Sequence, residues 1–154
     1  MTASAFRAEH VVRSAAFTLE LPRDRAFELF TPEGERAWAP GWEPRYLHPA
    51  GGRAGEGMVF TTSQTEETIW MMLRYQPAEG RVEYLRLTPG SRLGVVRVEC
   101  ASLSPTRTRV SVSYELTALT EAGNATIAAL DDAAFSAFIA GWPEAINRAL
   151  AKAG

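Results

Sequence analysis

The order of the expected elements along residues 11–151 is the feature that most restricts how this chain folds. An alternation of apolar and polar residues over 16–21 predicts one half-buried strand, and two short helical segments follow it. Four or five strands joined by short turns come next, between residues 58 and 119, and one amphipathic helix closes the chain. Because a single helix laid across one curved antiparallel sheet often leaves space beneath it, this order predicts a cavity for a small molecule.

The helices are predicted from their start signals. The short ones are expected over residues 23–30 and 32–38, the second with Thr31 as its cap and a proline in its first turn. The closing helix is expected to begin at Asp131 or Asp132, whose carboxylates suit a cap and the positive end of the helix dipole. Its apolar stripe recurs every three or four positions and comprises Ala134, Phe135, Phe138, Trp142, Ile146 and Leu150.

The turns between the strands predict how the strands pair. Pairing across them sets Arg74 opposite Glu83 and Glu83 opposite Arg97, which gives one face of the sheet a ladder of opposite charges. The other face, expected to be concave and to meet the helix, collects Met58, Phe60, Ile69, Met71, Leu73, Tyr75, Val82, Tyr84, Val96, Val98, Cys100, Val110, Val112, Tyr114 and Leu116. The same pairing leaves an apolar group on the charged, convex face, formed by Trp70, Met72, Leu85, Leu87, Leu93 and Val95.

Composition narrows the classes of protein that fit. A chain of 154 residues predicts one domain, with residues 1–13 as a loose tail. The net charge of −2 gives no electrostatic footprint for nucleic acid. The single cysteine, Cys100, excludes an internal disulfide and favours a cytoplasmic location, and no apolar run is long enough for integral membrane association. With two histidines and one cysteine, no ligand set has zinc spacing, so neither a metal nor a cofactor is expected.

The strand and double helix over residues 17–38, the turn Thr88-Pro89-Gly90-Ser91, the segment 114–119 and the closing helix with Trp142 resemble one known family. The chain is similar to the Bet v 1-like superfamily, the START-related (SRPBCC) helix-grip proteins, and to its bacterial polyketide cyclase/dehydrase-like members. The resemblance implies an α+β fold in which a curved antiparallel sheet of six to seven strands wraps around a long C-terminal helix. It also implies a hydrophobic cavity, but no reaction, because relatives include carriers, cyclases, aromatases and chaperone regulators.

Arg86 is the strongest candidate for chemistry. The predicted pairing points it inward between Tyr84 and Thr88, where its guanidinium could hold a carboxylate, phosphate or enolate oxygen. Alternatively, it lies near the cavity mouth and reaches water or an acidic partner. Trp38 and Trp42 could line the mouth or merely anchor the helices and loop.

We therefore expect the protein to bind a small hydrophobic or amphipathic molecule between the sheet and the closing helix. The residues expected to line the cavity are Met58, Phe60, Met71, Tyr84, Arg86, Val98, Tyr114, Phe138 and Trp142. One alternative is a polyketide cyclase/aromatase-like enzyme, in which Arg86 holds an enolate and a tyrosine or His48 acts as acid or base. The other is a non-catalytic protein-interaction module, with a possible homodimer through Trp70, Met72, Leu85 and Leu87.

Overall fold

One curved antiparallel sheet forms the body of the protein, in a computed structural model that describes residues 5–153. Within these residues seven strands lie in the order β1-β7-β6-β5-β4-β3-β2, so that the first strand pairs with the last. The strands are β1 (His10–Leu19), β2 (Arg45–His48), β3 (Val59–Ser63), β4 (Glu67–Gln76), β5 (Arg81–Thr88), β6 (Arg92–Ser104) and β7 (Arg107–Ala118). The helices are α1 (Arg23–Glu28), α2 (Pro32–Glu35), α3 (Glu121–Ala129) and α4 (Asp132–Ala153), with a short 3₁₀ turn at Pro77–Glu79.

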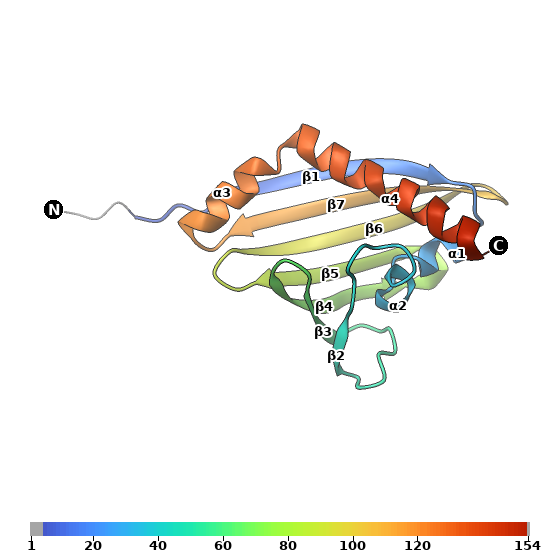
Figure 1. Ribbon diagram of the computed structural model, residues 1–154, viewed down its shortest axis with the longest axis horizontal. Helices are drawn as coiled ribbons and strands as arrows, with labels where there is room; N and C mark the ends of the chain where they lie inside the picture. The colour runs from blue at the N-terminus through green and yellow to red at the C-terminus, as the bar shows by residue number, and fades with distance from the viewer. Residues whose placement is uncertain (1–4, 154) are drawn as a thin grey trace.

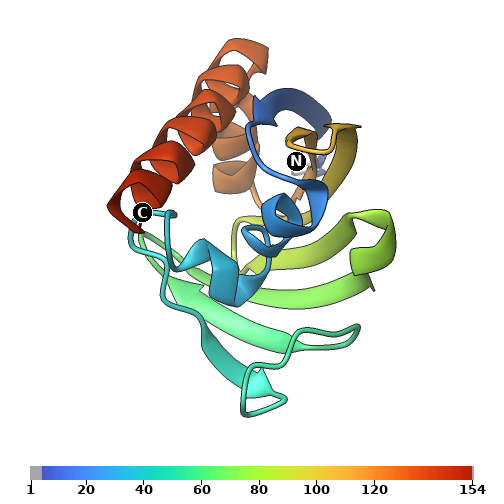
Figure 2. The ribbon, with the colours of Figure 1, turned by 90° about the vertical axis from the view of Figure 1, so that its right-hand side faces the viewer.

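The helices lie on one face of the sheet. In Figure 1 the long helix α4 runs obliquely across this face, and it contacts β1. Figure 2 shows α4 on one side and the curved strands on the other, with α1 and α2 between them at the near end. Helix α4 begins as predicted, since the backbone N–H of Ala134 donates to the Asp131 carboxylate over 2.8 Å. This arrangement is the helix-grip fold, with two short helices after the first strand.

The N-terminal segment is more ordered than predicted. Strand β1 begins at His10, so the expectation of a loose tail through residue 13 is wrong for its last four residues. Residues 1–4 of that tail lie outside the described residues. The side chain of Asn124 binds the backbone just before β1, accepting from the Glu9 N–H over 2.8 Å and donating to the Arg7 carbonyl over 2.9 Å. Asn124 belongs to α3, a nine-residue helix that precedes α4.

The pairing predicted for the charged face is confirmed from β5 to β7. Arg74 lies opposite Glu83, and Glu83 lies opposite Arg97. The Arg97 guanidinium bridges two strands, with its Nε 2.9 Å from Glu83 and its Nη1 3.1 Å from Glu115. The short turns determine this register. A slip by one residue would exchange the two faces of every strand and expose the apolar residues of the inner face.

Strand β4 departs from the prediction because it contains an irregularity between Met72 and Arg74. One extra residue there reverses the direction of every side chain before it. Trp70 and Met72 therefore point into the core, and Met72 is fully buried. The prediction that Ile69, Met71 and Leu73 face the helix is wrong: all three are exposed on the outer face. Apolar residues occupy five successive positions here, so alternation could not reveal the switch.

The apolar group on the convex face is real but differs in membership. Leu85 and Leu87 do lie there, paired with Met71 and Ile69 of β4. Trp70 and Met72 are buried, so the proposed homodimer surface through these two residues is wrong. Across residues 5–153, the structure contains no helix with the length and apolar character needed to cross a membrane.

Candidate functional site

A cavity of about 480 Å³ lies between the inner face of the sheet, the α2 region and α4. All four tryptophans of the chain line it: Trp38, Trp42, Trp70 and Trp142. Its other apolar walls come from residues on four different elements or loops, namely Phe30, Ala39, Pro40, Val96, Val98, Phe138 and Ala145. The cavity opens beside exposed residues of α4 and of the β3–β4 turn, including Glu144, Arg148 and Gln64.

The structure brings six of the nine predicted wall residues to this cavity: Tyr84, Arg86, Val98, Tyr114, Phe138 and Trp142. Three others lie elsewhere. Met58 and Phe60 are buried behind the wall, where the Phe60 ring stacks against Trp70 with ring centroids 5.8 Å apart. The expectation that Met71 lines the cavity is wrong. Met71 is on the outer face, because the irregularity in β4 puts Trp70 at the inward position instead.

The tryptophans present flat apolar surfaces to the cavity, and three of the four have their polar N–H group occupied by a protein acceptor. The indole N–H of Trp38 donates to the Leu29 carbonyl over 2.8 Å. Those of Trp42 and Trp70 donate to the Pro32 carbonyl over 2.8 Å and to the Thr62 hydroxyl over 3.0 Å. The rings also support one another, with centroids 5.2 Å apart for Trp38 and Trp142 and 5.6 Å apart for Trp42 and Trp70. The aromatic wall is thus rigid and largely without free donors of its own.

Arg86 points into the cavity from the inner face of β5. Its Nη2 donates to the Thr88 hydroxyl over 3.2 Å, and its guanidinium carbon lies 5.3 Å from the ring centroid of Trp70. Its Nε is buried without a hydrogen-bond partner, and the described residues offer it no ion pair. Burial lowers the pKa of this guanidinium, although arginine remains a cation at any ordinary pH. The arrangement leaves donors free for an acceptor from outside the chain.

Space for the Arg86 side chain comes from Gly94, its partner residue on β6. A Cβ atom at Gly94 would lie 3.2 Å from Arg86 Cγ and would collide with the Leu116 side chain. Glycine is therefore required here by close approach, with the Arg86 stem occupying the room that it leaves.

Glu35 is a second polar group in the cavity and was missed by the sequence analysis. It is the last residue of α2, a helix capped by Thr31, whose hydroxyl accepts from the Gly34 N–H over 3.1 Å. In the described residues its carboxyl group has no hydrogen bond or ion pair, and burial raises its pKa well above the ordinary value of 4.5. One signal was present: Glu35 precedes Trp38 by three residues, which places both on the same side of a helical segment.

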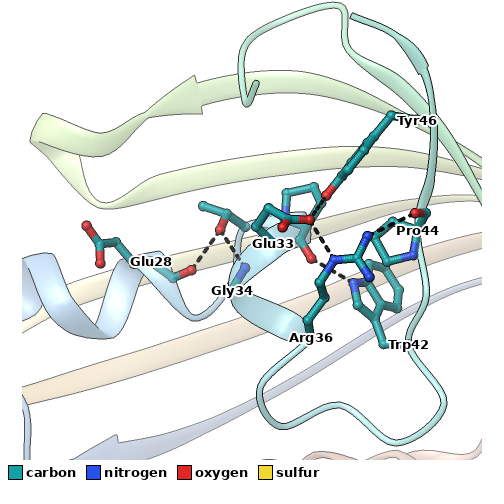
Figure 3. A network of polar contacts seen from close by, with 9 residues as sticks. Glu28, Glu33, Gly34, Arg36, Trp42, Pro44 and Tyr46 are labelled. Atoms are coloured by element: carbon teal, nitrogen blue, oxygen red, sulfur yellow. Dashed lines mark hydrogen bonds and ion pairs between the residues drawn. The ribbon is translucent and has the colours of Figure 1, made fainter. Parts of the chain in front are cut away.

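The α2 region is held in place by a set of contacts outside the cavity, shown in Figure 3 and here named the α2 latch (Glu33, Arg36 and Tyr46). The Tyr46 hydroxyl donates to the Glu33 carboxylate, and Arg36 Nε donates to the same oxygen over 2.6 Å. Arg36 Nη2 also donates to the Pro44 carbonyl over 3.3 Å. These contacts lower the pKa of Glu33, and burial with the Glu33 hydrogen bond raises that of Tyr46 to about 12. The latch fixes the loop after α2 against the helix that carries Glu35.

The two tyrosines of the wall differ in their hydrogen bonding. The Tyr84 hydroxyl donates to the Phe30 carbonyl over 2.6 Å, so it is satisfied within the protein. No hydrogen bond of the Tyr114 hydroxyl occurs among the described residues. Burial raises the pKa of Tyr114 to about 12, an effect that Arg86 opposes and Glu35 reinforces. Tyr114 is therefore within electrostatic reach of both groups and remains protonated at neutral pH.

The remaining candidates lie away from the cavity. His48 borders a separate shallow depression formed with the loop around residues 53–56, so its predicted role as acid or base in the cavity is wrong. Cys100 is a buried core residue, and burial raises the pKa of its thiol to about 12. Over residues 5–153, no three histidine, cysteine, aspartate or glutamate side chains cluster in a way that could hold a metal ion.

The sequence matches no protein-family model and no curated protein. Its structure is similar to that of norcoclaurine synthase from Thalictrum flavum in complex with dopamine and hydroxybenzaldehyde, with a TM-score of 0.66 and 8% identity over 92% of this chain and 88% of that one. It is also similar to the Mll3558 protein from Rhizobium loti, with a TM-score of 0.59 and 18% identity over 96% and 99% of the two chains. It is similar as well to the Zhui aromatase/cyclase from Streptomyces sp. R1128, with a TM-score of 0.52 and 17% identity over 73% of this chain and 69% of that one.

These similarities confirm the fold that the sequence resemblance implied. The chain has the Bet v 1-like, or SRPBCC, fold, and its structural neighbours include a synthase solved with small aromatic molecules and an aromatase/cyclase. At identities this low the comparisons establish the fold and leave the reaction of this chain open.

Proposed function

We propose that this protein binds a small hydrophobic or amphipathic molecule in the cavity between the sheet and α4. The observation that carries the proposal is the gathering of every tryptophan in the chain around one space of about 480 Å³. Small-molecule sites usually have volumes of roughly 300 to 1,000 Å³ and are lined by apolar and aromatic side chains with a few polar groups. The cavity fits this description, with Arg86, Glu35 and Tyr114 among its polar groups.

The neighbouring structures support the same proposal. Norcoclaurine synthase has been solved with dopamine and hydroxybenzaldehyde, which are small aromatic molecules. Such ligands have flat rings that match the flat indole faces of the present cavity.

Fluorescence tests the proposal directly, because a ligand in this cavity would contact the tryptophans. Titration with N-phenyl-1-naphthylamine, a neutral aromatic probe, is expected to give saturable probe emission and quenching of the tryptophan emission. The variant Ala145→Phe should weaken probe binding by about tenfold or more, because the new ring occupies the cavity. Ala140→Phe is the matched control, on the exposed side of the same helix, and should bind like the wild type.

Native mass spectrometry of gently purified protein supplies a second readout, in which a bound molecule appears as a discrete added mass. Absence of saturable probe binding by the wild-type protein would reject the proposal.

A second candidate function, a cyclase- or aromatase-like enzyme, is favoured by one specific observation. Glu35, Arg86 and Tyr114 come from three elements, α2, β5 and β7, and each has free hydrogen-bonding capacity in the same cavity. In such an enzyme Arg86 would stabilise an enolate oxygen, and Glu35 or Tyr114, whose pKa values are raised by burial, would donate a proton.

Turnover of a linear poly-β-ketone substrate to an aromatic product is the test of this candidate. Glu35→Gln and Arg86→Met should lower the rate while keeping affinity for the neutral probe. If turnover is undetectable in the wild type, or equal in the wild type and both variants, the catalytic candidate fails and ligand binding stands alone.

A further inference from the structure

We infer that the ligand is an aromatic acid with a second polar oxygen, the acid group binding Arg86 and the second oxygen binding Glu35. This inference rests on the proposed function, because it assigns the ligand of the same cavity. It depends on the separation of two unpaired polar groups within one aromatic enclosure.

The environment of Arg86 in the cavity favours an anion. Arg86 makes one hydrogen bond, to a neutral hydroxyl, and its Nε has no partner within the described residues. The neighbouring cation, Arg92, is already neutralised by Glu66, with Nη2 and Oε2 3.0 Å apart. A carboxylate accepts two parallel hydrogen bonds from the planar guanidinium, and it would supply the countercharge that the chain does not.

Glu35 offers a different kind of contact. Glu35 and Arg86 line the same cavity from α2 and β5, yet they form no ion pair. A protonated carboxyl group has one donor and free acceptor capacity, so it suits a hydroxyl or carbonyl oxygen on the ligand. The burial that raises the pKa of Glu35 favours its neutral form, which would not repel an acid. Tyr114 responds to both groups and lies where it could contact the body of the same molecule.

The aromatic walls of the cavity suit a planar aromatic body. The indole rings of Trp38 and Trp42 come from the loop that follows α2. Those of Trp70 and Trp142 come from β4 and α4. The N–H groups of Trp38, Trp42 and Trp70 are occupied by protein acceptors. Discrimination between ligands of similar shape therefore falls mainly on the polar groups Arg86 and Glu35.

A matched series of naphthalene probes tests the assignment. The dissociation constants of 2-naphthoic acid, 2-naphthamide and 6-hydroxy-2-naphthoic acid are measured by fluorescence titration at neutral pH. The acid should bind roughly 10- to 100-fold more tightly than the amide, as expected for a charge-assisted hydrogen bond in a buried site. The 6-hydroxy group should add about a further three- to tenfold, as expected for a neutral hydrogen bond.

Variants assign each preference to its residue. Arg86→Met should abolish the preference for acid over amide, whereas Arg97→Met, which removes a cation from the outer face, should keep it. Glu35→Met should abolish the gain from the hydroxyl group, and Glu35→Gln should retain it because the amide keeps a donor and an acceptor. Glu28→Met removes an exposed carboxylate from α1 and is the control for Glu35→Met.

The neutral probe N-phenyl-1-naphthylamine separates the two levels of failure. If the wild type does not bind it, the proposed function fails. If the wild type binds it but binds 2-naphthoic acid and 2-naphthamide equally, the present inference is overturned and the proposed function survives. This wild-type comparison needs no variant, so it decides the matter even where a substitution impairs folding.

Discussion

The guanidinium carbon of Arg86 lies 5.3 Å from the ring centroid of Trp70, its partner residue on the adjacent strand. A buried cation normally requires an acidic partner, and here an aromatic face takes part of that role. The contact exists because the irregularity in β4 turns Trp70 toward the inner face of the sheet, the same face toward which Arg86 points. Arg86 is therefore held in place without being neutralised.

Replacing Arg86 with methionine is expected to stabilise the protein by about 1 kcal/mol, because a buried, incompletely paired cation is exchanged for an apolar side chain of similar length. Urea unfolding monitored by circular dichroism measures the change. Arg97→Met is the control and should cost up to about 1 kcal/mol, since it loses exposed ion pairs to Glu83 and Glu115. Marked destabilisation by Arg86→Met would instead identify Arg86 as a structural residue.

Gly94→Ala is expected to destabilise the protein by about 1 to 3 kcal/mol, because the added methyl group meets Leu116 and the Arg86 stem in a filled core. Equilibrium unfolding in urea provides the measurement. Gly55→Ala serves as the comparison, because open space surrounds Gly55. Equal stability of Gly94→Ala and the wild type would contradict the close approach between β5, β6 and β7.

Two adjacent methionines test the irregularity in β4. Met72 is fully buried and Met71 is 38% exposed, so Met72→Ala should cost about 2 to 5 kcal/mol and Met71→Ala only about 0.5 kcal/mol. Thermal or urea unfolding of the two variants gives the comparison. The reverse order of stabilities would restore the regular alternation predicted from the sequence.

The pH dependence of stability should reveal Glu35. Its pKa in the folded protein is raised above the unfolded value, so the folded state binds more protons between the two pKa values and stability falls as pH rises through this window. Glu35→Gln should therefore match the wild type below pH 4.5 and become the more stable protein at high pH. The titratable and charged groups that face Glu35 across the cavity and its mouth are Tyr84, Tyr114, Arg86, Glu144 and Arg148.

Melting temperatures of Glu35→Gln and wild type across a pH series measure this effect. Glu28→Gln, on an exposed surface of α1, should show no such divergence. Parallel curves for Glu35→Gln and wild type would show that Glu35 is not desolvated.

The α2 latch predicts a link between Tyr46 and the mobility of the cavity wall. Tyr46→Phe removes the hydrogen bond to Glu33 and should cost about 1 kcal/mol, while hydrogen exchange of the amides of residues 34–39 becomes faster. Tyr75→Phe is the control, because the Tyr75 ring packs on Phe27, centroids 5.9 Å apart, without a described hydroxyl hydrogen bond. Unchanged exchange in Tyr46→Phe would mean that the latch does not restrain α2.

The sequence predicted the fold well where turns and alternation act together. The strands from β5 to β7 are joined by short turns, and their alternating residues define the register without ambiguity. It failed at β4, where apolar residues serve both faces, and at β2, whose four residues lie in a segment rich in glycine and proline. In both places the structure depends on contacts with other strands, which local patterns do not encode.

The same contrast applies to the candidate site. Arg86 was found because it is a charged residue at an inward position of a regular strand, where it breaks the apolar pattern. Glu35 was not found because α2 has only four residues, so that its spacing of three from Trp38 is a weak indication of its inner side. The direction of the Glu35 side chain is set by the Thr31 cap, which is a local backbone feature, and by the α2 latch, which is a tertiary contact.

Within one short turn of chain, Glu33 secures the segment from outside and Glu35 faces the interior. Because the anchoring contacts involve Glu33, Arg36 and Tyr46, the identity of residue 35 is nearly independent of what holds the segment in place. Evolution could therefore exchange the chemical group offered at this end of the cavity by a single substitution while the surrounding architecture stayed intact. Ligand preference could then change by substitutions that leave the stability of the fold nearly unchanged.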